Sequence, residues 1–466
     1  MIFMRKALFA VIGLFVVAAV AWSGFWFYGK GRIADEVEAQ AQLIRDRGGD
    51  VAYDDIEIGG FPFGYTGRIV APTATMTQET TIAEGVDPVE TSYTWSAPWI
   101  EASATVTAPN TLELTFPETQ NVLLTISGQD DETVTMPIEM TSENLEITTT
   151  RDGTDVRFEG GAQKIRTVAT MDTGDAGNAN VDYTMRALKT SGVFKPEQST
   201  DKRLHLMVDY DIEGFDGTTT IDGNDEMPGG TLAFKGGAAV GKVDTLGAET
   251  VGSFTLADLA ATLDFPAMGD QPVEIGLGTM SMNSQTPNSA GPDAQPFAYR
   301  MELESVTLGD QIWAMLDPAK AFPRAINALA VDLSGDAVFI ALPSDTEAFV
   351  TAMEDGMPII VNTMKLNDLT VDALGLKAKG KGEGTLENNI PQGTATLGVG
   401  GFADFMNSLV KSGRIPPQQA MVVQLMVENF GKLDEDGETI RFDFAAREGM
   451  IYVNDVPIGE APMLPQ

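Results

Sequence analysis

The chain has 466 residues and an apolar fraction of 43%, enough for a large folded core, so wholesale disorder is excluded. Its 30 basic and 67 acidic residues give a net charge of −37, which argues against a nucleic-acid partner because phosphate binding needs an excess of Lys and Arg. With no cysteine and one histidine, His205, the chain has no thiolate or multi-histidine metal site. We therefore expect no metal and no cofactor.

The first predicted element is a membrane-spanning helix. Residues 7–28 carry no charge, and a helix of that length, at about 1.5 Å per residue, crosses a bilayer core of about 30 Å. Arg5 and Lys6 precede it, which favours an N-terminus in the cytoplasm. The residues that mark this span, from its start to its aromatic far end, are Ala7, Leu14, Trp22, Trp26 and Tyr28. We expect residues 1–32 to anchor the chain in the inner membrane of a bacterium.

A cleaved signal peptide is the alternative for the same segment. Ala19-Val20-Ala21 fits an A-x-A cleavage site after a short apolar core. The apolar run continues through Phe25, Trp26 and Phe27, which favours an uncleaved anchor with a single pass. In both interpretations the bulk of the chain is exported, and the lack of cysteine favours the periplasm.

A short juxtamembrane helix is predicted over residues 33–50. Ile33, Val37, Ala41 and Ile44 recur at helical spacing, and Gly48-Gly49 ends the pattern.

Residues 51–285 are predicted to form a β-rich periplasmic region. Short runs alternate apolar residues with Thr and acidic residues, as in Leu112–Phe116, and Asp-Gly and Gly-Gly pairs separate them. The most distinctive local string is expected to be a structural turn, in which two flexible glycines precede a proline between two aromatic anchors. Its residues are Gly59, Gly60, Phe61, Pro62 and Phe63.

Residues 286–466 are predicted to form a second β-rich region that carries the few helices. A segment rich in Asn, Ser, Pro and Gly around residues 283–296 suggests the division. Apolar residues at helical spacing predict helices near 311–328, 401–411 and 417–430. The expected fold is therefore mainly β, with one or more long curved antiparallel sheets and a few helices after the transmembrane helix.

Three strings resemble ligand-binding motifs, and each is better explained by a turn. Gly236–Lys242 fits a phosphate loop, but Val243 stands where Ser or Thr is needed. Gly398–Ala403 fits a dinucleotide loop without its downstream acid, so we interpret it as a strand-to-helix turn. Asp209–Gly214 begins like a calcium loop but lacks the final Glu, since residue 220 is Thr. A looser calcium site among Asp216, Asp222 and Asp225 stays open as an alternative to a solvated acidic loop.

The strings together resemble one bacterial family. An anchor, a short helix, the "GGFPF" turn and a β-rich body are similar to the bacterial domain of unknown function 2125, and the similarity continues at Phe322–Arg324, Val331–Gly335 and the C-terminal Met450–Leu464. This family is uncharacterised, so the resemblance implies location and architecture and no reaction. A more distant, architectural similarity is to AsmA-like envelope proteins, some of which carry lipid tails on a long antiparallel sheet.

Two functions follow as hypotheses. The first is a membrane-anchored protein of the cell envelope that holds a lipid or another apolar ligand on a curved β-sheet. The alternative is an envelope scaffold or protein-interaction module without a ligand, whose protein partner the sequence does not identify. We do not expect an enzyme, because there is one histidine, no cysteine and no complete catalytic motif. A carboxylate pair for glycoside cleavage stays open, since its spacing depends on the fold.

Overall fold

The computed structural model describes most of the chain after the N-terminal segment. The described residues are 38, 41–42, 45, 49–59, 64–80, 89–105, 107–127, 133–172, 178–199, 204–223, 228–269, 271–342, 346–355, 357–387, 390–435 and 437–462. Within these ranges, no helix has the length and hydropathy needed to cross a bilayer. The anchor expected over residues 1–32, with Ala7, Leu14, Trp22, Trp26 and Tyr28, lies outside them.

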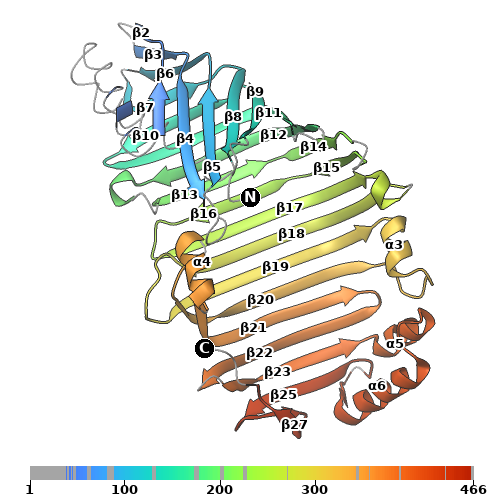
Figure 1. Cartoon of the computed structure of the whole chain (residues 1–466). Coiled ribbons are helices and arrows are strands. Elements are labelled where there is room, and N and C mark those ends of the chain that lie inside the picture. The colour runs from blue at the N-terminus through green and yellow to red at the C-terminus, as the bar shows by residue number, and fades with distance from the viewer. Residues whose placement is uncertain are drawn as a thin grey trace. The chain divides into compact units, whose positions relative to one another are not determined.

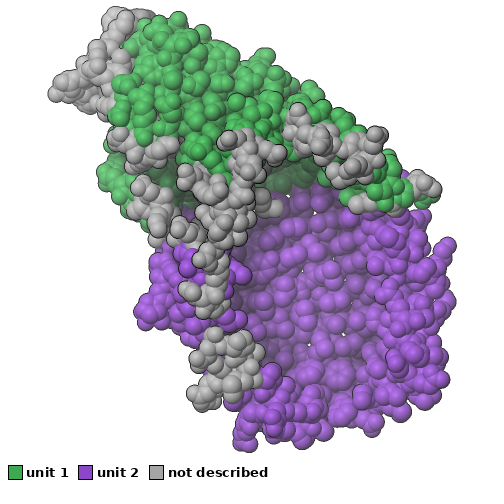
Figure 2. Space-filling model, viewed as in Figure 1, with its two compact units in different colours: residues 1–240, 262–271 green, residues 241–261, 272–466 purple. Residues whose placement is uncertain are grey.

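The chain divides into two compact units (Figure 2). Unit 1 comprises residues 1–240 and 262–271, and unit 2 comprises residues 241–261 and 272–466. Antiparallel strands dominate both units, as the sequence predicts, and few helices accompany them (Figure 1).

Unit 1 is built from short strands followed by long ones. The short strands are β1 (Gly49–Ala52), β2 (Asp55–Gly59), β3 (Gly64–Val70), β4 (Thr73–Thr80), β5 (Val89–Ser96), β6 (Trp99–Thr105), β7 (Ala108–Thr115), β8 (Thr119–Ser127), β9 (Thr133–Glu143) and β10 (Glu146–Asp152). Then come β11 (Asp155–Asp172), β12 (Asn178–Phe194), the 3-10 turn η3 (Pro196–Gln198), β13 (Leu206–Ile212), β14 (Gly214–Ile221) and β15 (Gly230–Gly236). Next along the chain come β16 (Ala239–Asp244) and β17 (Glu249–Asp264), most of whose residues belong to unit 2, and then η4 (Pro266–Met268) in unit 1.

Strand β11 joins two series of strands in unit 1. One series runs β2–β3–β6–β7–β10 and reaches the first half of β11, over residues 155–161. The other runs β1–β4–β5–β8–β9 and reaches the second half, over residues 164–169. Strand β12 then pairs along the whole of β11, and β14 and β15 continue from it.

The core of unit 1 lies between these two series. Its buried residues are Trp95, Ala97, Ile100, Ala104, Leu112, Leu114 and Phe116, which come from strands of both series and the segments that flank them. Ile100 and Ala104, like Leu112 and Leu114, alternate with outward-facing residues, so period-2 patterning directs each strand's apolar side inward. The one polar group of the Trp95 side chain is satisfied, because its Nε1 donates to Gln120 Oε1 at 3.1 Å.

Unit 2 is a meander of long strands. These are β18 (Val273–Pro287), β19 (Gln295–Leu308), β20 (Ile326–Phe339), β21 (Ile359–Ala373), β22 (Leu376–Glu387), β23 (Ile390–Gly400), β24 (Lys432–Leu433), β25 (Ile440–Arg447), β26 (Met450–Val453) and β27 (Val456–Glu460). Consecutive strands pair antiparallel from β18 to β23, and the ladder continues through β25, β26 and β27.

The helices of unit 2 lie at the ends of its strands (Figure 1). They are α3 (Asp310–Leu316), α4 (Thr346–Asp355), α5 (Phe402–Lys411) and α6 (Pro417–Phe430). Helices α3 and α5 follow β19 and β23, whereas α4 joins β20 to β21. Because β19 and β23 run in the same direction, α3, α5 and α6 lie at the same end of the strands. Helix α4 lies at the opposite end.

Some boundaries differ from the expected ones. The helix expected near 311–328 ends at Leu316, because Asp317 leaves the helical region and its carboxylate accepts from the backbone N–H groups of Ala321 and Phe322 at 2.9 Å. The helices expected near 401–411 and 417–430 match α5 and α6.

The polar segment that suggested a division at 285/286 joins β18 to β19, which pair as a hairpin. Turn residues mark hairpin loops as well as domain linkers, so their composition alone does not distinguish the two.

At the start of the chain, the described residues of the expected helix over 33–50 are helical up to Arg45, and β1 begins at Gly49. The strands on either side of the expected turn, β2 and β3, pair antiparallel, and Gly59 ends β2. Its residues Gly60, Phe61, Pro62 and Phe63 lie outside the described ranges.

Candidate functional site

The strands of unit 2 separate apolar from polar side chains with unusual consistency. In β19 the apolar residues Phe297, Tyr299, Met301 and Leu303 alternate with Ala298, Arg300 and Glu302. Successive side chains of a strand point to opposite faces, so these four share one face of the sheet. We call it the apolar face, and we call the opposite one the polar face.

The register continues the apolar face onto β20. Met301 lies opposite Val331, Leu303 lies opposite Leu329, and Tyr299 lies opposite Leu333. Directly paired residues of an antiparallel ladder project to the same side, so each apolar residue of β19 has an apolar neighbour across the strand.

On β21 a bulge keeps the apolar residues in line. Leu366 and Leu369 are three residues apart, which in a regular strand would put them on opposite faces. The ladder shifts between Asp332 and Leu333, so that Val331 lies opposite Leu369 and Leu333 lies opposite Leu366. The extra residue, Asn367, is exposed and donates to Asp332 Oδ1 at 2.8 Å and Ser334 Oγ at 2.9 Å.

Beyond β21 the apolar face becomes flatter. Gly380 and Gly382 of β22 stand opposite Leu397 and Ala395 of β23. Further across, Leu397 pairs with Phe442 and Ala395 pairs with Phe444 of β25, whose rings have centroids 6.3 Å apart. The residues that continue the face at its ends are Met280 and Met282 of β18, Val371 of β21, Ala378 of β22, Val399 of β23, Ile440 of β25, and Ile451 and Val453 of β26.

These side chains remain open to solvent to an extent that a core would not allow. Every apolar residue just described for β18 to β25 is at least partly exposed, and Met364 of β21, which also belongs to this face, is 50% exposed. Among the described elements of unit 2, the main contacts between helices and strands join α3 to β18 and α5 to β22. Because the apolar side chains stay partly exposed, the described elements of unit 2 do not seal the apolar face.

The size of this face is large for a monomer. Strands lie about 4.8 Å apart and rise about 3.4 Å per residue, so the seven strands β18 to β23 and β25, with about eight residues each, cover a projected area on the order of 900 Å². The largest exposed apolar patch of a typical monomer is about 300–600 Å² and is often functional.

The polar face carries ion pairs in place of apolar residues. Arg300 Nη2 lies 2.5 Å from Glu302 Oε1, and Arg300 Nη1 lies 3.6 Å from Asp332 Oδ2. The hydrogen bond from Arg300 and its positive charge outweigh slight burial and hold the pKa of Glu302 below its usual value. This carboxylate stays ionised and hydrated, which suits a wet surface better than acid catalysis.

Of the three motif-like strings, the dinucleotide-like one is a strand-to-helix turn as interpreted, whereas the calcium-like one, interpreted as a turn, begins within a strand. The residue that would begin a phosphate-loop helix lies in β16, a strand. Asp209 and Asp211 lie in β13, which is also a strand. Gly401 adopts a φ of +69° at the start of α5, and a Cβ there would lie 2.2 Å from Gly375 O, so the turn requires glycine. No group of three or more His, Asp or Glu that could bind a metal occurs in the described ranges.

The apolar face was not identified from the sequence as a site. Alternation within Phe297–Leu303 and Leu329–Leu333 was the available signal, and it predicts one apolar side per strand. It leaves open whether those sides face a second layer.

One comparison with known proteins is positive. The profile of the family described as "Uncharacterized protein conserved in bacteria (DUF2125)" matches residues 26–268 and 212–462. No curated protein and no solved structure is detectably similar to the chain.

Proposed function

The chain belongs to this DUF2125 family of uncharacterised bacterial proteins, and we propose that it is an envelope protein that holds the acyl chains of a lipid on the apolar face of unit 2. In this proposal residues 1–32 anchor it in the inner membrane and the two units lie in the periplasm. It has no catalytic role. The observation that carries the proposal is an apolar face of seven strands, β18 to β23 and β25, whose apolar side chains stay partly exposed.

The chemistry of the face favours hydrocarbon as the occupant. Covering apolar surface releases about 25 cal/mol per Å², and acyl chains need no hydrogen bonds from the protein. The Gly380–Gly384 stretch of β22 has low relief, and a flexible chain can lie over it without a shaped pocket. A protein partner would instead be expected to present polar groups at a rim and a few large anchors.

Photocrosslinking on the full chain in cells tests this directly. Benzoylphenylalanine placed at Val331 projects from the apolar face, and the same group at the adjacent Ala330 projects from the polar face. We expect lipid adducts at position 331, identified by mass spectrometry, and none at position 330.

Each other outcome has a clear meaning. Equal lipid labelling at both positions would reflect bulk membrane contact and would contradict the proposal. Reproducible crosslinks from position 331 to one protein, without lipid, would favour the scaffold or interaction module instead.

A further inference from the structure

Helix α6 exposes apolar side chains around much of its circumference. Met421, Val422, Val423, Leu425 and Met426 are 65%, 52%, 38%, 51% and 56% exposed. At about 100° per residue these five positions cover roughly 200° of the helix, twice the width of an ordinary core-facing stripe. A helix that docks into a protein groove needs only the narrower stripe.

The charge around α6 contrasts with that of the whole chain. No acidic residue occurs between Phe405 and Val427, whereas Lys411 and Arg414 lie in that interval. Glu428 lies in the last turn of α6, and Lys432 follows the helix after Gly431. In a chain of net charge −37, residues 405–427 are thus a stretch with two positive charges beside an apolar surface, bounded by Asp404 and Glu428.

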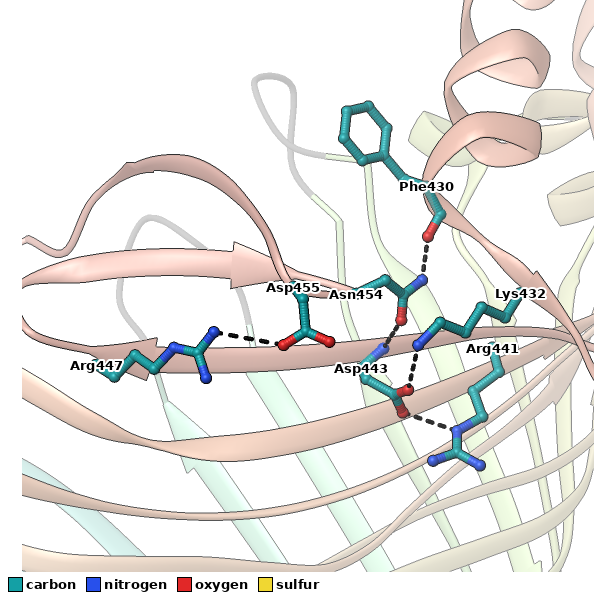
Figure 3. A network of polar contacts seen from close by, with 7 residues as sticks. All are labelled: Phe430, Lys432, Arg441, Asp443, Arg447, Asn454 and Asp455. Atoms are coloured by element: carbon teal, nitrogen blue, oxygen red, sulfur yellow. Dashed lines mark hydrogen bonds and ion pairs between the residues drawn. The ribbon is translucent and has the colours of Figure 1, made fainter.

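Contacts at both ends hold α6 in place. Before it, the Arg414 guanidinium donates to the carbonyl of Leu316, and Phe405 of α5 packs on Phe322 with ring centroids 5.6 Å apart. After it, the Asn454 amide donates to the carbonyl of Phe430 and accepts from the Asp443 N–H at 2.9 Å (Figure 3). The exposed apolar side chains therefore sit on a positioned helix.

After α6, the basic residues are paired with the carboxylate of Asp443. Arg441 Nε donates to Asp443 at 2.7 Å, and Lys432 Nζ donates to the same carboxylate at 3.4 Å (Figure 3). Burial favours the neutral acid, but these two cations outweigh it and keep the pKa of Asp443 below its usual value. Lys411, by contrast, is exposed and has no ion pair within 4.0 Å in the described ranges.

We propose that α6 docks on the surface of an anionic lipid membrane, with its five apolar side chains at the boundary between headgroups and acyl chains and with Lys411 among the headgroups. An apolar arc next to basic residues is the pattern of helices that lie in a membrane interface. This docking is independent of lipid storage on the sheet, so either proposal can fail alone.

The lack of cysteine permits a specific test on the full chain. Met421→Cys and Leu425→Cys, each labelled with the polarity-sensitive dye NBD, are reconstituted in vesicles of phosphatidylcholine with 30% phosphatidylglycerol. Met76→Cys in β4 is the control, because Met76 is 47% exposed but lies in unit 1. We expect a blue-shifted emission at 421 and 425 that doxyl-labelled lipids quench, and neither effect at 76.

The charge is tested by Lys411→Glu in the Met421→Cys background. One basic residue near an anionic surface contributes about 1 kcal/mol, so we expect the ratio of docked to undocked helix to fall about fivefold or more with phosphatidylglycerol and little without it. Two results would overturn the proposal: emission at 421 and 425 as in water, or a blue shift that doxyl lipids do not quench, which would show α6 covered by protein.

Discussion

Asp317 shows how a single buried carboxylate shapes the edge where α3 ends. Its side chain is 1% exposed, and it accepts from the backbone N–H groups of Ala321 and Phe322. Burial favours the neutral form, but these hydrogen bonds, helped by Arg324 and Lys411, outweigh it and lower the pKa of Asp317. The ionised carboxylate therefore stabilises the fold.

The sign of this effect predicts a pH dependence. Because the folded pKa lies below the unfolded one, the stabilisation is complete above about pH 4 and is lost as pH falls through the folded pKa. Asp317→Asn should lower Tm at pH 7, and the gap to the native chain should narrow towards pH 3. Thermal unfolding followed by circular dichroism measures this difference in Tm at each pH. A difference in Tm that does not change with pH would refute the stabilising role of the Asp317 carboxylate.

Leu114 represents the core of unit 1 at the residue scale. Its side chain is 1% exposed, between strands of the two series. Leu114→Ala should lower the free energy of unfolding of this unit by about 2–5 kcal/mol, from lost burial and the cavity left behind. Leu123→Ala on β8 is the matched control, because Leu123 is 41% exposed, and should cost clearly less. Denaturant titration compares the two, and equal losses would contradict this account of the core.

At the scale of the element, bulges are what make the apolar face continuous. The strand period is two, so one inserted residue moves all later side chains to the other face. Asn367 is such an insertion in β21, between Leu366 and Leu369.

Deleting Asn367 should therefore do more than remove its hydrogen bonds. The deletion turns either Leu366 or Leu369 towards the polar face, and we expect a loss of several kcal/mol or failure to accumulate folded protein. Asn367→Ala keeps the bulge and should cost about 1 kcal/mol or less, since its bonds are exposed. Protease resistance of the two variants distinguishes them; similar behaviour would mean that the bulge is dispensable.

At the scale of the whole molecule, the chain places much apolar surface outside a core. Val331→Glu puts a charge in the middle of the apolar face, whereas Ala330→Glu on the polar face is its matched control. If the face holds acyl chains, lipid recovered with the purified full chain should fall at least severalfold in the first variant and little in the second. Quantitative lipid mass spectrometry gives the ratio, and equal recovery would count against the site.

The proposed location is also testable on the whole chain. Since the chain has no cysteine, Thr396→Cys in β23 should react with a membrane-impermeant maleimide once the outer membrane is permeabilised. Phe3→Cys, ahead of the predicted anchor, should react only after the inner membrane is opened. In sealed inner-membrane vesicles of known orientation, the maleimide should therefore label only one of these two cysteines. Labelling of both cysteines, or of neither, would contradict an N-terminus in the cytoplasm.

The sequence by itself determined the β-rich fold, helices α5 and α6 and the family, because these depend on local patterns. Alternation in Phe297–Leu303 directs one side of a strand, and Gly401 stops β23 before α5, whatever surrounds them. The bounds expected near 311–328 ran past the end of α3, although Pro318 interrupts the apolar pattern after Leu316; the Asp317 contacts at this end form only on folding.

Only the tertiary structure decided that the apolar sides of successive strands join into one face without a second layer. Register is set by pairing between strands, and the bulge at Asn367 keeps Leu366 and Leu369 of β21 on one face although they are three residues apart. Whether the apolar side of a strand is covered depends on which elements pack on it. The residue composition of the strand is the same whether that side is covered or exposed. The sequence therefore predicted an amphipathic sheet, and the fold showed that its apolar face lacks a covering layer among the described elements.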